Sequence, residues 1–246
     1  MRKYIYLFLL FIVFSIQSSA QTAHAQESWW DYLNQNRFSN KWGSWLDLQT
    51  KRKDHFVNAL NANEYALGAA YYPTEKLKIT GALTFVDQYP ATNKPYHLSE
   101  YRPWQQIQLN TNTKKAKWTQ WLRLEERFKE TAINNAASGN YDFNYRLRYY
   151  ILGQFPITKH PYEKGAVSFV SSEELYLNFG KNIVYNTFDQ NRFFLGFYYY
   201  INKANILQLG YTNLFQKYNA PNKYLNSDVL RISVFNNVDL RKNKGH

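Results

Sequence analysis

Residues 121–128 read WLRLEERF, a short stretch in which charged and apolar side chains alternate. In an extended chain Arg123, Glu125 and Arg127 fall on one face, and the leucines and the phenylalanine fall on the other. Two architectures accommodate such a strand. A soluble sandwich or lipocalin-like barrel packs the apolar face inward, whereas a transmembrane barrel turns that face to lipid and lines its lumen with the polar face. Periodicity alone does not separate the two.

The same alternation recurs in long segments, separated by polar breaks, to the end of the chain. Such segments exceed the usual strand length of about 5–6 residues and suit a tilted membrane-spanning strand, which needs about 9–11 residues. No segment shows a helical period, and no linker rich in proline or serine divides the chain. The predicted strands are residues 29–38, 41–52, 60–72, 76–89, 99–111, 116–129, 140–153, 165–179, 189–201, 205–217 and 225–238.

The predicted fold is therefore all-β, a single antiparallel transmembrane β-barrel of about 10–12 strands that occupies residues 21–246. The number of segments is odd, whereas bacterial barrels built from one chain have an even number of strands. We expect either that residues 29–38 do not form a regular spanning strand or that the pattern hides one further segment.

Residues 1–20 have the pattern of a secretory signal peptide. Arg2 and Lys3 precede an apolar run of about 13 residues, and small residues end the segment at Ala20, the predicted cleavage site. A cut after Ala25 is the weaker alternative. The apolar run is shorter than the roughly 20 residues of a spanning helix, which argues against an uncleaved anchor. We predict export to the outer membrane of a Gram-negative cell.

The composition excludes several classes of site. The chain has no cysteine, so it forms no disulfide, thiolate zinc site or thiol nucleophile. Its 5 histidines are scattered, and no pair has metal-ligand spacing. Loss of Arg2 and Lys3 with the leader leaves 28 basic against 18 acidic residues, a net charge of +10. The basic residues form no compact patch with stacking aromatics, so we predict contacts with outer-membrane lipid and not with nucleic acid.

Three features favour the membrane barrel over the soluble one. The signal peptide directs the chain out of the cytoplasm, and the polar faces carry arginine more often than lysine, which suits a network inside a barrel. Aromatic residues also gather near the strand ends, as in the two interfacial girdles of membrane barrels. These aromatic groups are Trp29 and Trp30, Trp42 and Trp45, Tyr71 and Tyr72, Tyr101 and Trp104, Trp118 and Trp121, and Tyr198 to Tyr200.

The polar faces then predict a basic lumen. Arginine outnumbers the acidic residues on them, among which are Asp47 and Asp142. Such a lumen favours a narrow channel or binding site for small anionic solutes. A barrel filled by its own side chains, with an Arg/Glu network that stiffens the wall, is the structural alternative. The lumen-lining candidates are Arg102, Arg123, Glu125, Arg127, Arg146, Arg148, Glu174, Arg192 and Arg231.

One segment breaks the pattern. Strict alternation turns Glu173 outward near the middle of its predicted strand, where a charge in lipid is unfavourable. A β-bulge at Ser171 and Ser172 would shift the register and turn this carboxylate inward.

The lengths of the breaks predict the orientation. The breaks at 39–40, 73–76, 112–115 and 202–204 are short, and those at 53–59, 90–98, 130–139, 180–188 and 217–224 are longer. Short turns are periplasmic and long loops extracellular in such barrels, which places the C-terminus in the periplasm. Cysteines introduced at Asn93 and Asn135, and not at Lys114, are then expected to be accessible from outside.

Several motifs, in this order, resemble a family of Gram-negative outer-membrane proteins known as domain of unknown function 2490. They cover most of the chain after the leader. The resemblance implies an outer-membrane β-barrel and no established substrate, catalytic residue or cofactor. The motifs are KWGSWLDLQTKR (41–52), EYRPWQQIQL (100–109), WLRLEERF (121–128), YRLRYY (145–150), EELYLNF (173–179) and FDQNRFFLGFYY (188–199).

An outer-membrane lipid-modifying enzyme is the main functional alternative, and a soluble periplasmic barrel that binds a small ligand is another. A barrel hydrolase needs a serine and a histidine close together on one strand face. His55 and His97 lie in predicted loops, and Ser99 follows His97 in a segment interrupted by Pro95. We therefore predict no enzyme activity, no metal site and no cofactor.

Overall fold

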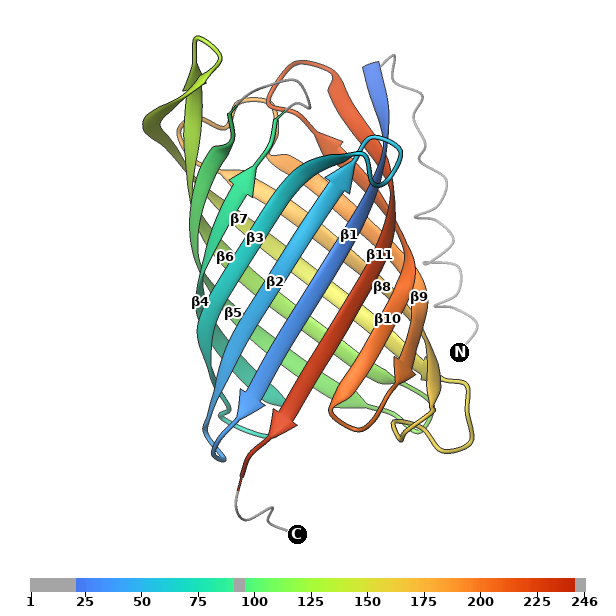
Figure 1. The fold of residues 1–246 in the computed structure, drawn as a ribbon. Coiled ribbons are helices and arrows are strands. Elements are labelled where there is room, and N and C mark those ends of the chain that lie inside the picture. Colours follow the sequence, from blue (N-terminus) through green and yellow to red (C-terminus); the bar gives the residue numbers. More distant parts are fainter. Residues whose placement is uncertain (1–20, 91–95, 242–246) are drawn as a thin grey trace, which may run out of the picture.

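Eleven β-strands close into one barrel in the computed structural model, which describes residues 21–90 and 96–241 (Figure 1). The predicted signal peptide and Asn93 lie outside these residues. Within the described chain, no helix is long and apolar enough to cross a bilayer. The strands are β1 (Gln21–Arg37), β2 (Trp42–Lys53), β3 (Ala59–Tyr71), β4 (Leu77–Gln88), β5 (Leu98–Asn112), β6 (Lys117–Ile133), β7 (Ala136–Pro156), β8 (Val167–Phe179), β9 (Phe188–Tyr200), β10 (Asn205–Lys217) and β11 (Lys223–Asp239).

The barrel closes through a parallel pair. Each strand pairs with its sequence neighbours in antiparallel fashion, but β1 and β11 run parallel from Gln21 opposite Lys223 to Arg37 opposite Asp239. With an odd number of strands in up-and-down order, the first and last strands must point the same way. The prediction of a wholly antiparallel barrel is therefore wrong at this one pair. Both explanations offered for the odd count are also wrong, because residues 29–37 belong to β1, a strand of 17 residues, and the described barrel has eleven strands with no further segment.

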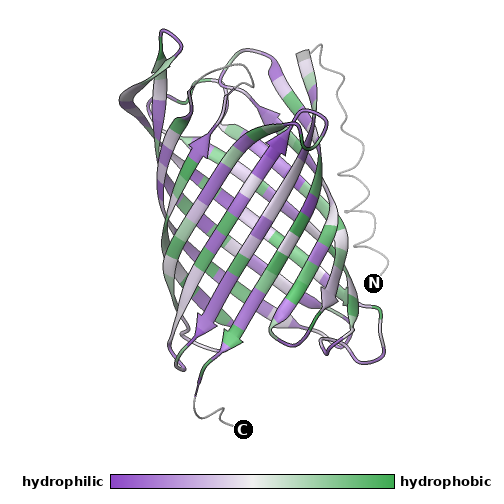
Figure 2. Cartoon of the chain, in the orientation of Figure 1, coloured by the Kyte–Doolittle hydropathy of each residue, from purple (hydrophilic) through white to green (hydrophobic). Residues whose placement is uncertain are grey.

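Apolar side chains cover the outside of the barrel, and polar side chains fill the inside. In the stretch 121–128, Leu122 is 48% exposed and points outward, whereas Glu125 is fully buried inside. Figure 2 shows the same alternation as bands of opposite hydropathy along the strands. A cluster of buried hydrophobic residues, Trp29, Leu214 and Val229, lies inside the described barrel. The faces are thus the reverse of those in a sheet that packs its apolar side inward.

The predicted aromatic girdles are only half right. Trp30, Trp42 and Tyr101 are exposed on the outer surface, as a girdle requires. Trp29 and Trp104 are buried inside the barrel. Inward positions in the predicted groups also include Trp45, Trp121, Tyr198 and Tyr200. Neighbours in a strand point to opposite faces, and so do residues three apart, so each group divides between the two surfaces.

The bulge predicted at Ser171 and Ser172 is absent. Both residues pair in regular register with β7 and β9, and the irregularity in β8 lies between Tyr176 and Leu177. Glu173 therefore points outward, where its carboxylate accepts a hydrogen bond from the Asn191 amide on β9. The charge of Glu173 is thus accommodated by a hydrogen bond from Asn191 on β9 and not by a shift in register.

The two ends of the barrel differ (Figure 1). Loops after β2, β4, β8 and β10 lie at the end where β1 begins, and the turns after β1, β3, β5 and β9 lie at the opposite end, near the C-terminus. The connection at 157–166 is long yet lies at the turn end. The predicted loop at 130–139 is instead a hairpin that extends past the rim, with Asn134 and Asn135 at positive φ in its tight turn. Asp142 is exposed on this hairpin and does not line the lumen.

Ionic contacts fasten the closing strands to the turn end. The Arg37 guanidinium donates to both Glu75 oxygens at 2.6 and 2.7 Å, and Arg241 Nη1 lies 3.3 Å from Glu75 Oε1. Arg241 also pairs with Asp239, the last residue of β11. Because Arg37 ends β1, this cluster links the parallel seam to the turn between β3 and β4.

Glu75→Gln is expected to lower the melting temperature of the barrel near neutral pH and to have no effect in acid. Hydrogen bonds from Arg37 hold the pKa of the exposed Glu75 carboxyl below its ordinary 4.5. The stabilisation is complete above the ordinary pKa and is lost as the pH falls through the lowered one. Melting curves of both proteins in detergent at about pH 7 and about pH 3 measure it. Glu163→Gln, exposed at the same end, is the control. A difference between wild type and Glu75→Gln that persists in acid contradicts the role of the charge.

Candidate functional site

A cavity of about 900 Å³ occupies the interior of the barrel. Its lining includes Asp54 and Pro90 in the loops at one end, and Gln35 and Asn237 near the turns at the other end. The cavity therefore extends along most of the barrel. Its wall is uneven, because β3 contributes small inward residues such as Ala62 and Ala66 where other strands contribute arginines.

A network of ion pairs covers one part of the wall. Glu125, at its centre, accepts hydrogen bonds from Arg146 Nε at 2.7 Å and from Arg148 Nη1 at 2.6 Å. Glu100 accepts from Arg102 Nε at 2.8 Å and from Arg127 Nε at 2.6 Å. All these side chains are buried or nearly so, and in this environment charge-assisted hydrogen bonds are strong.

The network joins side chains of six strands, β3 and β5 to β9. Arg102 reaches Glu64 on β3 at 3.2 Å, Arg148 Nε donates to Glu174 on β8 at 2.8 Å, and Arg146 reaches Asp189 on β9 at 3.1 Å. Arginine suits this role because its planar fork serves two carboxylates at once. The guanidinium groups of these arginines are therefore bound by carboxylates of the barrel wall and are not available to a solute.

Two further cations have only neutral close partners. Lys78 Nζ donates to Gln35 Oε1 at 2.6 Å, and Arg192 Nε donates to Gln190 Oε1 at 3.2 Å. Neither forms an ion pair with a carboxylate of the described chain. Each rests on an aromatic face, Lys78 at 4.8 Å from the Trp45 ring and Arg192 at 4.6 Å from the Trp29 ring. A ring and a neutral amide hold a cation in place but leave its charge largely uncompensated.

Arg123 is intermediate between the two groups. Its Nε and Nη2 donate to Gln106 Oε1 at 2.9 and 2.7 Å, and its guanidinium lies 3.8 Å from the Trp104 ring. Its closest approach to a carboxylate is 3.8 Å, from Nη1 to Glu125 Oε1. This distance is too long for a hydrogen bond.

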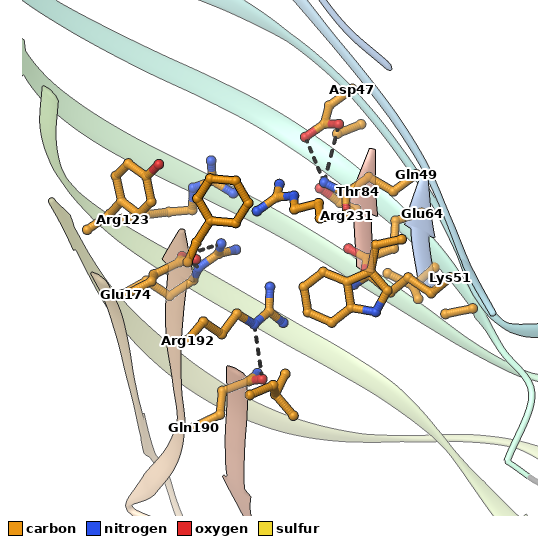
Figure 3. Close-up of a pocket in the computed structure, with 18 of the residues that line it drawn as sticks. Asp47, Gln49, Lys51, Glu64, Thr84, Arg123, Glu174, Gln190, Arg192 and Arg231 are labelled. Carbon is orange, nitrogen blue, oxygen red and sulfur yellow. Dashed lines mark hydrogen bonds and ion pairs between the residues drawn. The ribbon is translucent and has the colours of Figure 1, made fainter. Parts of the chain in front are cut away.

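Guanidinium groups converge on the cavity from different strands (Figure 3). Arg123 on β6, Arg192 on β9 and Arg231 on β11 point toward the same space, and Asp47 approaches from β2. Arg231 Nε donates to Asp31 Oδ2 at 2.8 Å. Asp47 is hydrogen-bonded only weakly, by Gln49 at 3.4 Å.

Basic side chains outnumber acidic ones along the described lining. The basic ones are Lys51, Lys53, Arg102, Arg123, Arg127, Lys129, Arg146, Arg148, Arg192, Lys217 and Arg231. The acidic ones are Glu27, Asp47, Asp54, Glu64, Glu100, Glu174 and Asp189. The interior therefore carries a net positive charge, and such a charge attracts anions.

The nine residues predicted to line the lumen all lie inside the barrel, but they have different surroundings. Six of them belong to the carboxylate-paired network, namely Arg102, Glu125, Arg127, Arg146, Arg148 and Glu174. Arg192 lacks such a partner, Arg123 has only a distant one, and Arg231 is tied at one nitrogen.

Sequence reasoning missed Lys78 and the inward tryptophans that support the cations. Lys78 lies two residues before Thr80 on the polar face of its strand, and Trp104 lies two residues after Arg102. The alternation of side chains along these strands therefore already predicted that Lys78 and Trp104 point inward. The tryptophans were assigned to the outer girdles because of their residue type.

His97 and Ser99 each lie beside a carboxylate. His97 Nε2 lies 3.7 Å from Asp87 Oδ1. The Ser99 hydroxyl donates instead to Glu130 Oε2 at 2.8 Å, in the hairpin beyond the rim.

Residues 26–225 match a family model described as a protein of unknown function, DUF2490. No curated protein and no solved structure matches the chain. The match covers most of the barrel, from β1 to the start of β11, and includes all the network residues and the three cations that rest on rings. The chain therefore belongs to the DUF2490 family.

Proposed function

We propose that this protein is an outer-membrane β-barrel whose lumen is a narrow passage or binding site for small anionic solutes. The apolar outer surface supports the membrane location, because a barrel in water would expose these side chains at a large free-energy cost. The polar interior supports a solvated lumen.

The observation that carries the proposal is the set of cations without close carboxylate partners. Arg192 lines the cavity near the middle of the barrel, and Lys53 and Lys217 line it at the loop end. Lys78 is buried in the wall near the turn end. These positive charges are thus distributed along the interior of the barrel. Uncompensated cations raise the local anion concentration and lower the barrier to anion passage.

A structural barrel with no transport role is the second candidate. The ion-pair network favours it, because Glu125 and its arginines join several strands and stiffen the wall. The two candidates differ in what they require of Arg192 and Lys78, which contribute little to the network.

The location is tested by fractionation and labelling. The mature protein is expected with the outer membrane, soluble only in detergent. A cysteine at Asn135 in the hairpin turn is expected to react with an impermeant reagent on whole cells, and one at Lys114 in the turn after β5 only after lysis. Recovery in the soluble periplasmic fraction would refute the membrane location, and the reverse labelling would invert the orientation.

The lumen is tested with purified protein in planar bilayers. Discrete conductance that favours chloride over potassium is the expected result. Silent bilayers, with protein whose gel mobility on heating shows a folded barrel, would leave the structural barrel as the function.

A further inference from the structure

Two arginines present unpartnered ends to the middle of the cavity. Arg231 uses Nε to bind Asp31, and Arg192 uses Nε to bind Gln190, while the terminal nitrogens of both form no hydrogen bond in the described chain. In the network, by contrast, Arg148 donates from Nε and both terminal nitrogens to Glu125 and Glu174. Arg192 and Arg231 are therefore tethered at the inner nitrogen and available at the outer fork.

Both forks are held from behind. The Arg192 guanidinium lies 4.6 Å from the ring centroids of both Trp29 and Tyr176. Asp31, which fixes Arg231, also accepts from the Ser233 hydroxyl at 2.8 Å. Side chains restrained in this way lose little further freedom when a ligand binds, and this preorganisation favours affinity.

Two glycines without side chains lie in the barrel wall between the two arginines. Gly196 on β9 and Gly210 on β10 are paired, and Gly210 also lies opposite Arg231. A Cβ on either glycine would lie 2.5 Å from the Phe194 ring, so this ring covers the backbone where larger side chains would enter the cavity. The two glycines thus make room for the Phe194 ring to lie flat against this part of the wall, below the arginine side chains.

The chemistry of the forks selects the ligand. One carboxylate offers two oxygens in one plane and matches a single guanidinium fork. A phosphate group offers several oxygens in tetrahedral directions and carries up to two charges, so it can bridge two forks that approach from different strands. Arg123 adds a further positive charge from β6 (Figure 3).

We propose that Arg192 and Arg231 form a binding site for a dianionic phosphate group in the middle of the lumen. The site deepens the proposed function and rests on it only for access of the solute. Asp47 faces the same space and repels an anion, so it limits the affinity. Inorganic phosphate and a phosphate ester present the same group to the forks.

Calorimetric titration of the folded barrel in detergent at about pH 8 tests the site without requiring conductance. Inorganic phosphate, glucose 6-phosphate, succinate and chloride are the probes. Both phosphate probes are expected to bind more tightly than succinate, and chloride the least. Tighter binding of the ester than of inorganic phosphate would assign the site to phosphorylated solutes, and the reverse to free phosphate.

Three variants are expected to change the affinity for phosphate in three different ways. Arg192→Gln is expected to weaken phosphate binding by about tenfold or more, because it removes charge-assisted hydrogen bonds. Asp47→Asn is expected to strengthen it. Lys53→Gln, which removes an equal charge from the loop end of the lining, is expected to change it by less than about twofold. Unchanged gel mobility on heating verifies that each variant is folded.

The binding and conductance measurements distinguish the phosphate site from the proposed passage for anions. Phosphate binding no tighter than succinate binding, or equal binding by wild type and Arg192→Gln, overturns the site, even if bilayers conduct chloride. Silent bilayers together with Arg192-dependent phosphate binding support the site and refute the passage.

Discussion

Replacing Glu125 with glutamine is expected to destabilise the barrel by roughly 3–5 kcal/mol, the usual cost of removing one partner from a buried ion-pair cluster. The Glu125 side chain is fully buried, and its oxygens receive Arg146 and Arg148 at 2.6–2.7 Å. Arg102 and Arg123 lie within 3.9 Å. Loss of the carboxylate leaves these guanidinium groups close together without the anion that separates them.

Urea titration in detergent, followed by tryptophan fluorescence and gel mobility, measures this loss. Glu126→Gln is the matched control, since it removes a carboxylate from the next residue of the same strand, which points to the outer surface. The control is expected to change stability by less than about 1 kcal/mol. If Glu125→Gln is as stable as the control, the network does not hold the wall together.

Reversing the two cations with neutral partners is expected to reverse the ion preference of the lumen. In the double variant Lys78→Glu, Arg192→Glu, two basic groups inside the barrel become acidic, and no ion pair within 4 Å is broken in the described chain. The barrel should therefore still fold. The chloride-to-potassium permeability ratio, measured from reversal potentials in a salt gradient, is expected to fall by about tenfold or more.

The matched control reverses two charges outside the lumen. Lys203 lies in the turn after β9, and Lys223 begins β11 at the opposite end, both exposed. Glutamates at these positions are expected to leave the permeability ratio nearly unchanged, because salt screens exposed charges beyond about 10 Å. A folded lumen variant that still prefers chloride would show that Lys78 and Arg192 do not set the preference.

Local sequence determined which side chains face in and which face out. Leu122 and Arg123 point to opposite surfaces because successive side chains in a strand alternate, whatever the strand pairs with. The same rule placed the nine lumen candidates inside and most strand ends within a few residues. It failed at β1, which begins eight residues before the predicted start at Trp29, because the alternation there is weak.

Tertiary structure alone decided how the barrel closes and which charges are compensated. The alternation already predicted eleven strands, but only the closed barrel brings the first and last of them together as a parallel pair. Arg148 and Arg192 are equivalent in the alternation, yet one binds two carboxylates and the other only Gln190 and aromatic rings. Their partners come from other strands, through register and tilt. Whether an arginine stiffens the wall or faces a solute was therefore determined by the closed barrel, because only closure brings side chains from distant strands within a few ångströms of one another.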